Sequence, residues 1–247
     1  MNFFIIAGIL LLGAILGQAA NYISDVLPLR RKFTPPFCQQ CQNNLTVIEY
    51  LWMTNCPHCQ NPPSIRRWIV LVLYPVLLVY LYIQPHERLG FWLSALIAAY
   101  LLLIGIIDIE RKLILVPLTI AGVVIGTPIG YLLHGFIPTI LGGVCGFLVM
   151  FLLYLLGIGF IIIVNKIRKK PTDEVALGFG DVSLSAVLGL ILGFPGIFLG
   201  IFFAVILGGA FSILFLIYTL VKKQYQPLAA IPYAPFLIIS TLILLFH

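Results

Sequence analysis

Long, uninterrupted apolar segments constrain this chain more than any other feature of its sequence. Apolar residues make up 62% of the 247 residues and charged residues only 9%, whereas soluble proteins carry about 25% charged residues. So little polar surface excludes a soluble enzyme, a disordered protein and a disulfide-stapled secreted domain. Because the apolar runs are continuous rather than alternating, the sequence predicts an all-α, polytopic membrane protein and not a β-barrel.

About eight segments have the composition of transmembrane helices. The first is expected to stay in the membrane and not to be a cleaved signal peptide, because no basic region precedes it. The sixth has only about 13 residues, so a re-entrant segment is an alternative to a full span. The predicted spans are Asn2–Ile23, Trp68–Ile83, Phe91–Ile107, Ile114–Leu133, Phe136–Val164, Val182–Phe194, Gly196–Val221 and Tyr233–Phe246.

The basic residues predict how these spans are oriented. Every one of the 14 lysines and arginines except Arg88 falls in an odd-numbered loop. Because Lys and Arg are retained on the cytoplasmic side, the odd-numbered loops are expected in the cytosol and both termini outside. The net charge of +6 follows from this distribution and requires no nucleic-acid partner. The lipid bilayer is the partner that basic loops favour.

The predicted spans divide the chain into three parts. Residues 1–23 form a first transmembrane helix, residues 24–67 a cytosolic loop, and residues 68–247 the main membrane core. The loop has roughly 44 residues, which is too few for a large hydrophobic core of its own. It therefore needs another source of stability.

Two C-x2-C pairs in this loop, Cys38 with Cys41 and Cys56 with Cys59, supply that stability. Each pair directs two sulfurs at one point, and two such pairs make the tetrahedral thiolate site that is typical of structural zinc. Disulfides are disfavoured in the cytosol, and a metal can fold a loop that lacks a core. The sequence therefore predicts a small zinc-ribbon-like loop, with unmetallated cysteines as the alternative.

Two of the eight acidic residues, Asp108 and Asp181, stand at predicted membrane boundaries. An ionisable group at the end of a span is a functional candidate, although helix capping is the alternative for either residue alone. Two carboxyls held together share a proton, so that one can activate water while the other polarises a carbonyl. The flanking Gly178 and Gly180 would let the backbone approach an extended substrate.

Several motifs, taken in order, resemble those of the type IV prepilin peptidases, a family of intramembrane aspartic proteases. Gly178–Asp181 is similar to the family's G-x-G-D signature, which alone is weak, and Asp108–Pro117 is similar to the segment of its first aspartate. The resemblance runs nearly from end to end of the chain. It extends through the segments Gly17–Asn21, Leu27–Pro28, Pro35–Cys38 and Pro232–Phe236.

The resemblance implies an aspartic endopeptidase of the inner (plasma) membrane that removes the basic leader of prepilins or pseudopilins at the cytosolic face. Asp108 and Asp181 would be its catalytic pair, and the four loop cysteines would hold zinc. Many members also methylate the new N-terminal amine with S-adenosylmethionine. The pilus or secretion machinery would be a further partner. Glu110, Asp173 and Glu174 are acids that could recognise the basic leader.

Three positions depart from the family's pattern. Ser183 replaces a usual lysine, which removes a cation near the aspartates but leaves the pair itself. Leu71 stands where a glutamate tied to methyl transfer is usual, and Arg67 replaces a tyrosine. No soluble S-adenosylmethionine-binding fold is recognisable either. Peptidase activity is therefore expected, and methyl transfer is left open.

Other classes of protein remain as alternatives. A catalytically inactive scaffold could recruit pilus machinery through the cysteine loop. A transporter usually shows repeated halves and charges at mid-bilayer, and neither is visible here. A zinc metalloprotease would need H-E-x-x-H and a rhomboid-type serine protease G-x-S; both motifs are missing from the sequence.

Overall fold

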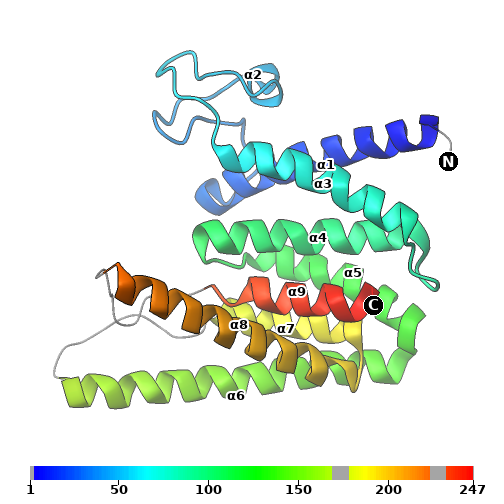
Figure 1. Ribbon diagram of the computed structural model, residues 1–247, viewed down its shortest axis with the longest axis vertical. Coiled ribbons are helices and arrows are strands. Elements are labelled where there is room, and N and C mark those ends of the chain that lie inside the picture. The colour runs from blue at the N-terminus through cyan, green and yellow to red at the C-terminus, as the bar shows by residue number, and fades with distance from the viewer. Residues whose placement is uncertain (1–2, 169–177, 223–231, 247) are drawn as a thin grey trace. The chain divides into compact units, whose positions relative to one another are not determined.

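The computed structural model of the chain is all-helical, as the sequence predicts (Figure 1). The structure describes residues 3–168, 178–222 and 232–246. Among these residues, six helices are long and apolar enough to cross a membrane, and two apolar helices are shorter. The helices are α1 (Phe3–Arg30), α2 (Val47–Leu51), α3 (Ile65–Ile83), α4 (Gly90–Arg111), α5 (Val116–His134), α6 (Phe136–Arg168), α7 (Phe179–Leu192), α8 (Gly196–Val221) and α9 (Ala234–Phe246).

All eight predicted spans form helices, but several of their ends differ from the prediction. α1 continues past Ile23 to Arg30, and α4 continues past Ile107 to Arg111. Hydropathy marks only the apolar part of a helix, so the polar turns at its end were missed. The doubtful sixth span forms α7, whose 14 residues give a length of about 21 Å, less than the hydrocarbon core of about 30 Å.

The chain divides into two compact units, Met1–Ile107 and Asp108–His247. In the first unit α1 packs along α3 (Figure 1). The contact is close at Gly13, where an added Cβ would lie 2.5 Å from the Cα of Pro75. Ile9, Leu78 and Ala95 form an apolar cluster that joins α1, α3 and the first part of α4.

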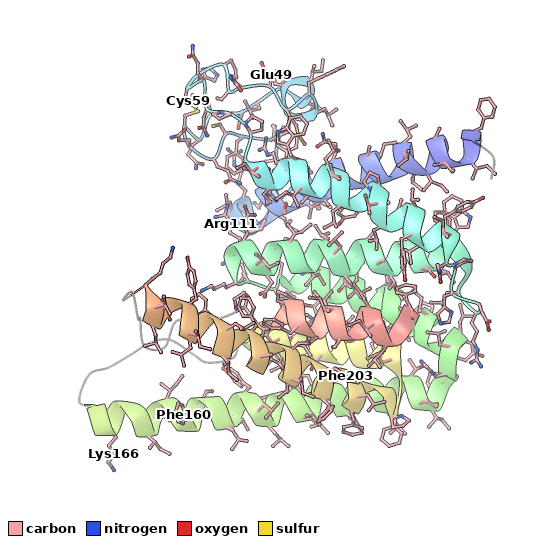
Figure 2. All side chains as sticks on the ribbon, viewed as in Figure 1. Glu49, Cys59, Arg111, Phe160, Lys166 and Phe203 are labelled. Atoms are coloured by element: carbon pink, nitrogen blue, oxygen red, sulfur yellow. The ribbon has the colours of Figure 1, made fainter. Side chains whose placement is uncertain are left out.

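In the second unit, α7 is the central helix and packs against α5, α6, α8 and α9. Several of its apolar side chains, among them Val182, Val187 and Ile191, are completely buried. The helices around it expose large apolar residues instead, for example Phe160 on α6 and Phe203 on α8 (Figure 2). Such faces suit contact with lipid, so the second unit buries its polar groups around α7.

The contact between α6 and α7 depends on glycines. An added Cβ on Gly142 of α6 would lie 2.3 Å from the carbonyl oxygen of Gly189 in α7, and one on Gly146 would lie 2.4 Å from that of Ser185. In membranes, small residues let helix backbones approach in this way, and the close approach itself drives association.

We therefore expect Gly142→Ala to destabilise the protein by about 1–3 kcal/mol, because the backbone of α7 has to move away. The thermal unfolding midpoint of the purified protein in detergent measures this effect. Gly159→Ala in the same helix is the matched control, since nothing lies within 4 Å of its Cβ position. Equal midpoints for the two variants would contradict the packing described here.

Candidate active site and metal centre

Asp108 lies in the last turn of α4 and is only 5% exposed. A helix C-terminus carries a partial negative charge, so a carboxylate is unfavourable there. Helix capping, the alternative considered for Asp108, therefore does not explain its position. Its Oδ2 atom is buried and has no hydrogen-bond partner among the described residues. An unpartnered buried oxygen of this kind is expected where a water molecule or a ligand group binds.

Asp181 lies in the first turn of α7 and is 8% exposed. Gly178 donates its backbone N–H to Oδ2 of Asp181 at 3.2 Å, so this carboxylate does cap its helix. At Gly180, an added Cβ would lie 2.9 Å from the Cβ of Ile114. The absence of a side chain at Gly180 thus lets α7 pack against the segment that follows α4. Approach of a substrate to Gly178 and Gly180 stays a prediction.

The first residue of α9 interacts with both aspartates. The backbone N–H of Ala234 interacts with the carboxyl groups of both Asp108 and Asp181. The two carboxyl groups also interact electrostatically with each other. Because Ala234 is the first residue of α9, the positive end of this helix dipole faces both carboxyls. The residues that the sequence singled out are therefore brought together, although they are far apart along the chain.

This arrangement is suited to acid–base chemistry. Two neighbouring carboxyls in a buried site do not both ionise, so they share one proton. The ionised carboxylate can accept a proton from water while the protonated carboxyl donates to a carbonyl oxygen. A polar backbone group that is already oriented, such as the Ala234 N–H, can stabilise the ionised form without reorganising.

Sequence reasoning assigned no role to Tyr233 and Ala234. Tyr233 has a buried hydroxyl without a hydrogen-bond partner among the described residues, and it interacts electrostatically with Asp181. The available signal was a tyrosine flanked by Pro232 and Pro235 immediately before an apolar segment. Of the acids considered for leader recognition, Glu110 is exposed, whereas Asp173 and Glu174 lie outside the described residues.

The four loop cysteines form a cluster in the first unit; Figure 2 shows Cys59 within it. All four Sγ atoms lie within 4.8 Å of one another. The Sγ atoms of Cys38 and Cys59 are 3.6 Å apart, as are those of Cys41 and Cys56. Tetrahedral zinc with Zn–S bonds of 2.3 Å would separate its sulfurs by about 3.8 Å. The cluster therefore fits a structural zinc ion held by four thiolates.

The two cysteine pairs fold into equivalent turns. In each turn the N–H of the first cysteine bonds the carbonyl oxygen five residues later, and the residue after the second cysteine has a positive φ. These bonds run from Cys38 to Asn43 (2.9 Å) and from Cys56 to Asn61 (3.0 Å), and the positive φ values are 61° at Gln42 and 55° at Gln60. The repeated turn aims both sulfurs of each pair at the same point.

The turns also prepare the thiols for a metal. Burial opposes ionisation of Cys38, but hydrogen bonds from the backbone N–H groups of Cys41 and Gln40 lower the pKa of its thiol to about 7. Backbone hydrogen bonds, first that of Cys59, also lower the pKa of Cys56. Because the thiolate is the form that binds metal, the local backbone favours coordination.

We expect the purified protein to hold an equimolar amount of zinc through dialysis against a mild chelator. Cys41→Ser removes one ligand and is expected to lower the retained zinc well below that amount, because structural zinc requires all four ligands. Elemental analysis measures the retained metal. Cys145→Ser is the matched control, since Cys145 lies in α6 and is not one of the four clustered cysteines. A wild-type protein that loses all zinc under these conditions would refute the metal site.

A buried ion network around Asp25, a residue not singled out in the sequence, holds the cysteine loop on α1 and α3. Asp25, at the end of α1, is 1% exposed and forms ion pairs with Arg66 and Arg67, the latter at 2.9 Å. The hydroxyl of Tyr50 donates to Oδ2 of Asp25 at 2.6 Å, and Nε2 of Gln39 donates to Oδ1 at 2.9 Å. The network thus joins two membrane helices to the first cysteine turn.

A cavity of about 800 Å³ lies between α1, α3 and the cysteine loop, and Leu71 forms part of its wall. None of the described residues that line it carries a charge. Among its polar groups, the Tyr22 hydroxyl donates to Thr34 and that of Tyr50 to Asp25. S-adenosylmethionine carries an ammonium, a carboxylate, a sulfonium and ribose hydroxyls, all of which need polar partners. Gln18 Oε1 is buried in the wall without a hydrogen-bond partner among the described residues, but the lining offers no charged side chain to the ammonium, carboxylate or sulfonium, so it does not fit that cofactor.

Fold and site together define a helical membrane protein with two buried aspartates at one helix N-terminus and a separate four-cysteine centre. Residues 95–213 match the type IV leader peptidase family. The matched region contains Asp108 and Asp181, whereas the cysteines precede it.

Three curated relatives carry the name prepilin leader peptidase/N-methyltransferase. The one from Aeromonas salmonicida (strain A449) is 26% identical over 213 residues, which cover 82% of this chain and 68% of the relative. The one from Aeromonas hydrophila is 28% identical with the same coverage. The one from Pectobacterium carotovorum subsp. carotovorum is 25% identical over 170 residues, or 66% of this chain and 56% of the relative. No solved structure matches the chain.

Proposed function

We propose that this chain is a membrane aspartic endopeptidase that cleaves the basic leader from type IV prepilins or pseudopilins at the cytosolic membrane face. The observation that carries the proposal is the approach of Asp108 and Asp181 to the single N–H of Ala234, in a chain that matches the type IV leader peptidase family over residues 95–213. A scaffold would have no need for two buried carboxyls that interact with each other.

In the proposed reaction, the ionised aspartate removes a proton from water while the water oxygen bonds to the scissile carbonyl carbon. The protonated aspartate gives its proton to the carbonyl oxygen, which forms a neutral tetrahedral diol. Collapse of the diol breaks the C–N bond: the departing amine takes the proton that came from water, and one hydroxyl proton of the diol returns to the second aspartate, which restores the starting pair. The Ala234 N–H interacts with both carboxyls, so it can stabilise whichever of them is ionised at each step.

The charge distribution supports the proposed orientation. The basic loops would lie in the cytosol, so the leader meets the site there while the apolar segment of the prepilin stays in the bilayer. Because those loops repel a basic leader, its recognition falls to acids such as the exposed Glu110. Zinc at the four cysteines would be structural, since four thiolates leave no position for a reacting water.

The proposal stops at cleavage and does not include methyl transfer. Leu71 contributes an apolar side chain to the cavity where the family resemblance would place a glutamate, and the cavity offers S-adenosylmethionine no charged partner among the described residues. The mature product is therefore proposed to leave with a free amine.

The test is a cleavage assay with the purified protein in lipid vesicles and a full-length prepilin with a Lys- and Arg-containing leader. We expect a product shortened by the length of the leader, with an N-terminal mass that stays unchanged when S-adenosylmethionine is added. Folded protein that cleaves neither a prepilin nor a pseudopilin would overturn the proposed function. A product heavier by one methyl group would overturn only the exclusion of methyl transfer.

A further inference from the structure

Tyr233 places a third polar group at the two aspartates. It directly precedes Ala234, whose N–H interacts with both carboxyls. Its hydroxyl interacts electrostatically with Asp181, yet it is buried and forms no hydrogen bond within the described part of the chain. A buried hydroxyl without a hydrogen-bond partner is unfavourable, so its presence beside two reactive carboxyls needs an explanation.

The ring of Tyr233 is held in place by its neighbours. Its Cε2 atom lies 3.3 Å from the position that a Cβ on Gly208 of α8 would take, so the ring packs directly against the backbone of that helix. The ring also packs against Phe236: the centroids of the two rings are 6.3 Å apart, and the angle between the ring planes is 56°. These contacts hold the ring from two sides and place its hydroxyl inside the protein.

Two buried polar atoms at this site thus have no hydrogen-bond partner among the residues that the structure describes, and their chemistry is complementary. Oδ2 of Asp108 is an acceptor, and the Tyr233 hydroxyl is a donor. Attack of water on a peptide bond requires such a combination: an acceptor for the proton of water, and a donor for the carbonyl oxygen on which negative charge develops. The missing partners of both atoms are then groups of the reacting molecules.

We propose that Tyr233 is a further catalytic residue of this site, whose hydroxyl donates a hydrogen bond to the carbonyl oxygen of the scissile peptide. This inference rests on the proposed function. Tyrosine keeps its proton throughout, and the proton that neutralises the carbonyl oxygen comes from the protonated aspartate. The hydrogen bond strengthens as charge builds on that oxygen, so it stabilises the transition state more than the bound substrate.

Tyr233→Phe tests the inference, because it removes the hydroxyl and keeps the ring that packs against Gly208. We expect kcat for leader cleavage to fall by about 100- to 1,000-fold, the usual effect of losing one such donor, with KM changed by less than about threefold. Tyr218→Phe on α8, where the ring is 55% exposed, is the matched control and is expected to leave both constants unchanged. The thermal unfolding midpoint is measured for every variant.

A second pair of variants tests the position of the ring with the hydroxyl intact. Gly208→Ala pushes the ring by a few tenths of an ångström and is expected to lower kcat several-fold, because misplaced groups lose catalytic effect. The adjacent Gly209→Ala is its control, since nothing lies within 4 Å of its Cβ position.

The outcomes separate this inference from the function on which it rests. If wild-type protein cleaves and Tyr233→Phe cleaves equally fast, the inference alone is overturned. A fall in kcat that is matched by a fall in the unfolding midpoint, or a rise in KM at unchanged kcat, also overturns it. If the wild-type protein does not cleave, the proposed function fails first and the role of Tyr233 fails with it.

Discussion

Replacing Asp108 or Asp181 by asparagine is expected to slow leader cleavage by at least about 1,000-fold in single-turnover assays. Asparagine has nearly the same volume as aspartate but neither takes up nor releases a proton at neutral pH. Because both carboxyls interact with the Ala234 N–H and share one proton, neither can replace the other. Glu87→Gln, a change at an exposed carboxylate in the loop between α3 and α4, is expected to cleave at the wild-type rate.

The double variant makes this prediction sharper. Groups that act as one unit have effects that do not add, so the variant with both asparagines is expected to be no slower than the slower single variant. If the effects of the two substitutions multiply instead, the aspartates act independently and the shared-proton mechanism is wrong. A single variant that keeps more than a tenth of the wild-type rate would remove its aspartate from the mechanism. An inactive scaffold would tolerate both substitutions.

The sequence identifies those candidate site residues whose side chains are rare in an apolar chain. Asp108, Asp181 and the four cysteines stand out because a membrane helix otherwise excludes such groups. Ala234 could not be found in this way, because it acts through its backbone N–H and its side chain carries no signal. Its contribution depends on the packing of α9 against α7, which is a tertiary contact.

The ends of the helices and the contacts of the cysteine loop also depend on features that a local sequence pattern does not predict. Hydropathy predicts where α1 and α4 are apolar, but not that they continue to Arg30 and Arg111. The short helix α2 does have a local signal, since Thr46 and Glu49 form a capping box at its start. Asp25 has no local sequence signal, because its role depends on ion pairs with arginines that are distant in sequence and come close only in the folded protein.

The largest effect on stability is expected at Asp25. Asp25→Asn keeps the shape of the side chain but removes the carboxylate that pairs with the buried Arg67. Arg67 is 8% exposed and its guanidinium lies 4.3 Å from the centre of the Tyr50 ring. Breaking a buried ion pair by removing one partner costs about 3–5 kcal/mol, because the remaining charge is left desolvated and unpaired.

This loss of stability is expected in the first unit, which contains both Asp25 and the cysteine loop. The denaturant midpoint at which zinc is released, followed with a chromophoric indicator, should fall sharply in Asp25→Asn, because Gln39 joins Asp25 to the first cysteine turn. Glu49→Gln in the same loop is the control with a smaller effect, since Glu49 is only partly buried and caps the short helix α2. Coincident midpoints for these two variants would show that the network does not hold the loop.

Removing a guanidinium as well separates the charge from the packing. If the cost of Asp25→Asn comes from unpaired buried charge, adding Arg67→Gln to it should recover part of the lost stability, although it deletes a further contact with Tyr50. If the network acts only through packed atoms, the second substitution should lower the midpoint further. The direction of that change decides whether Asp25 holds the cysteine loop by charge.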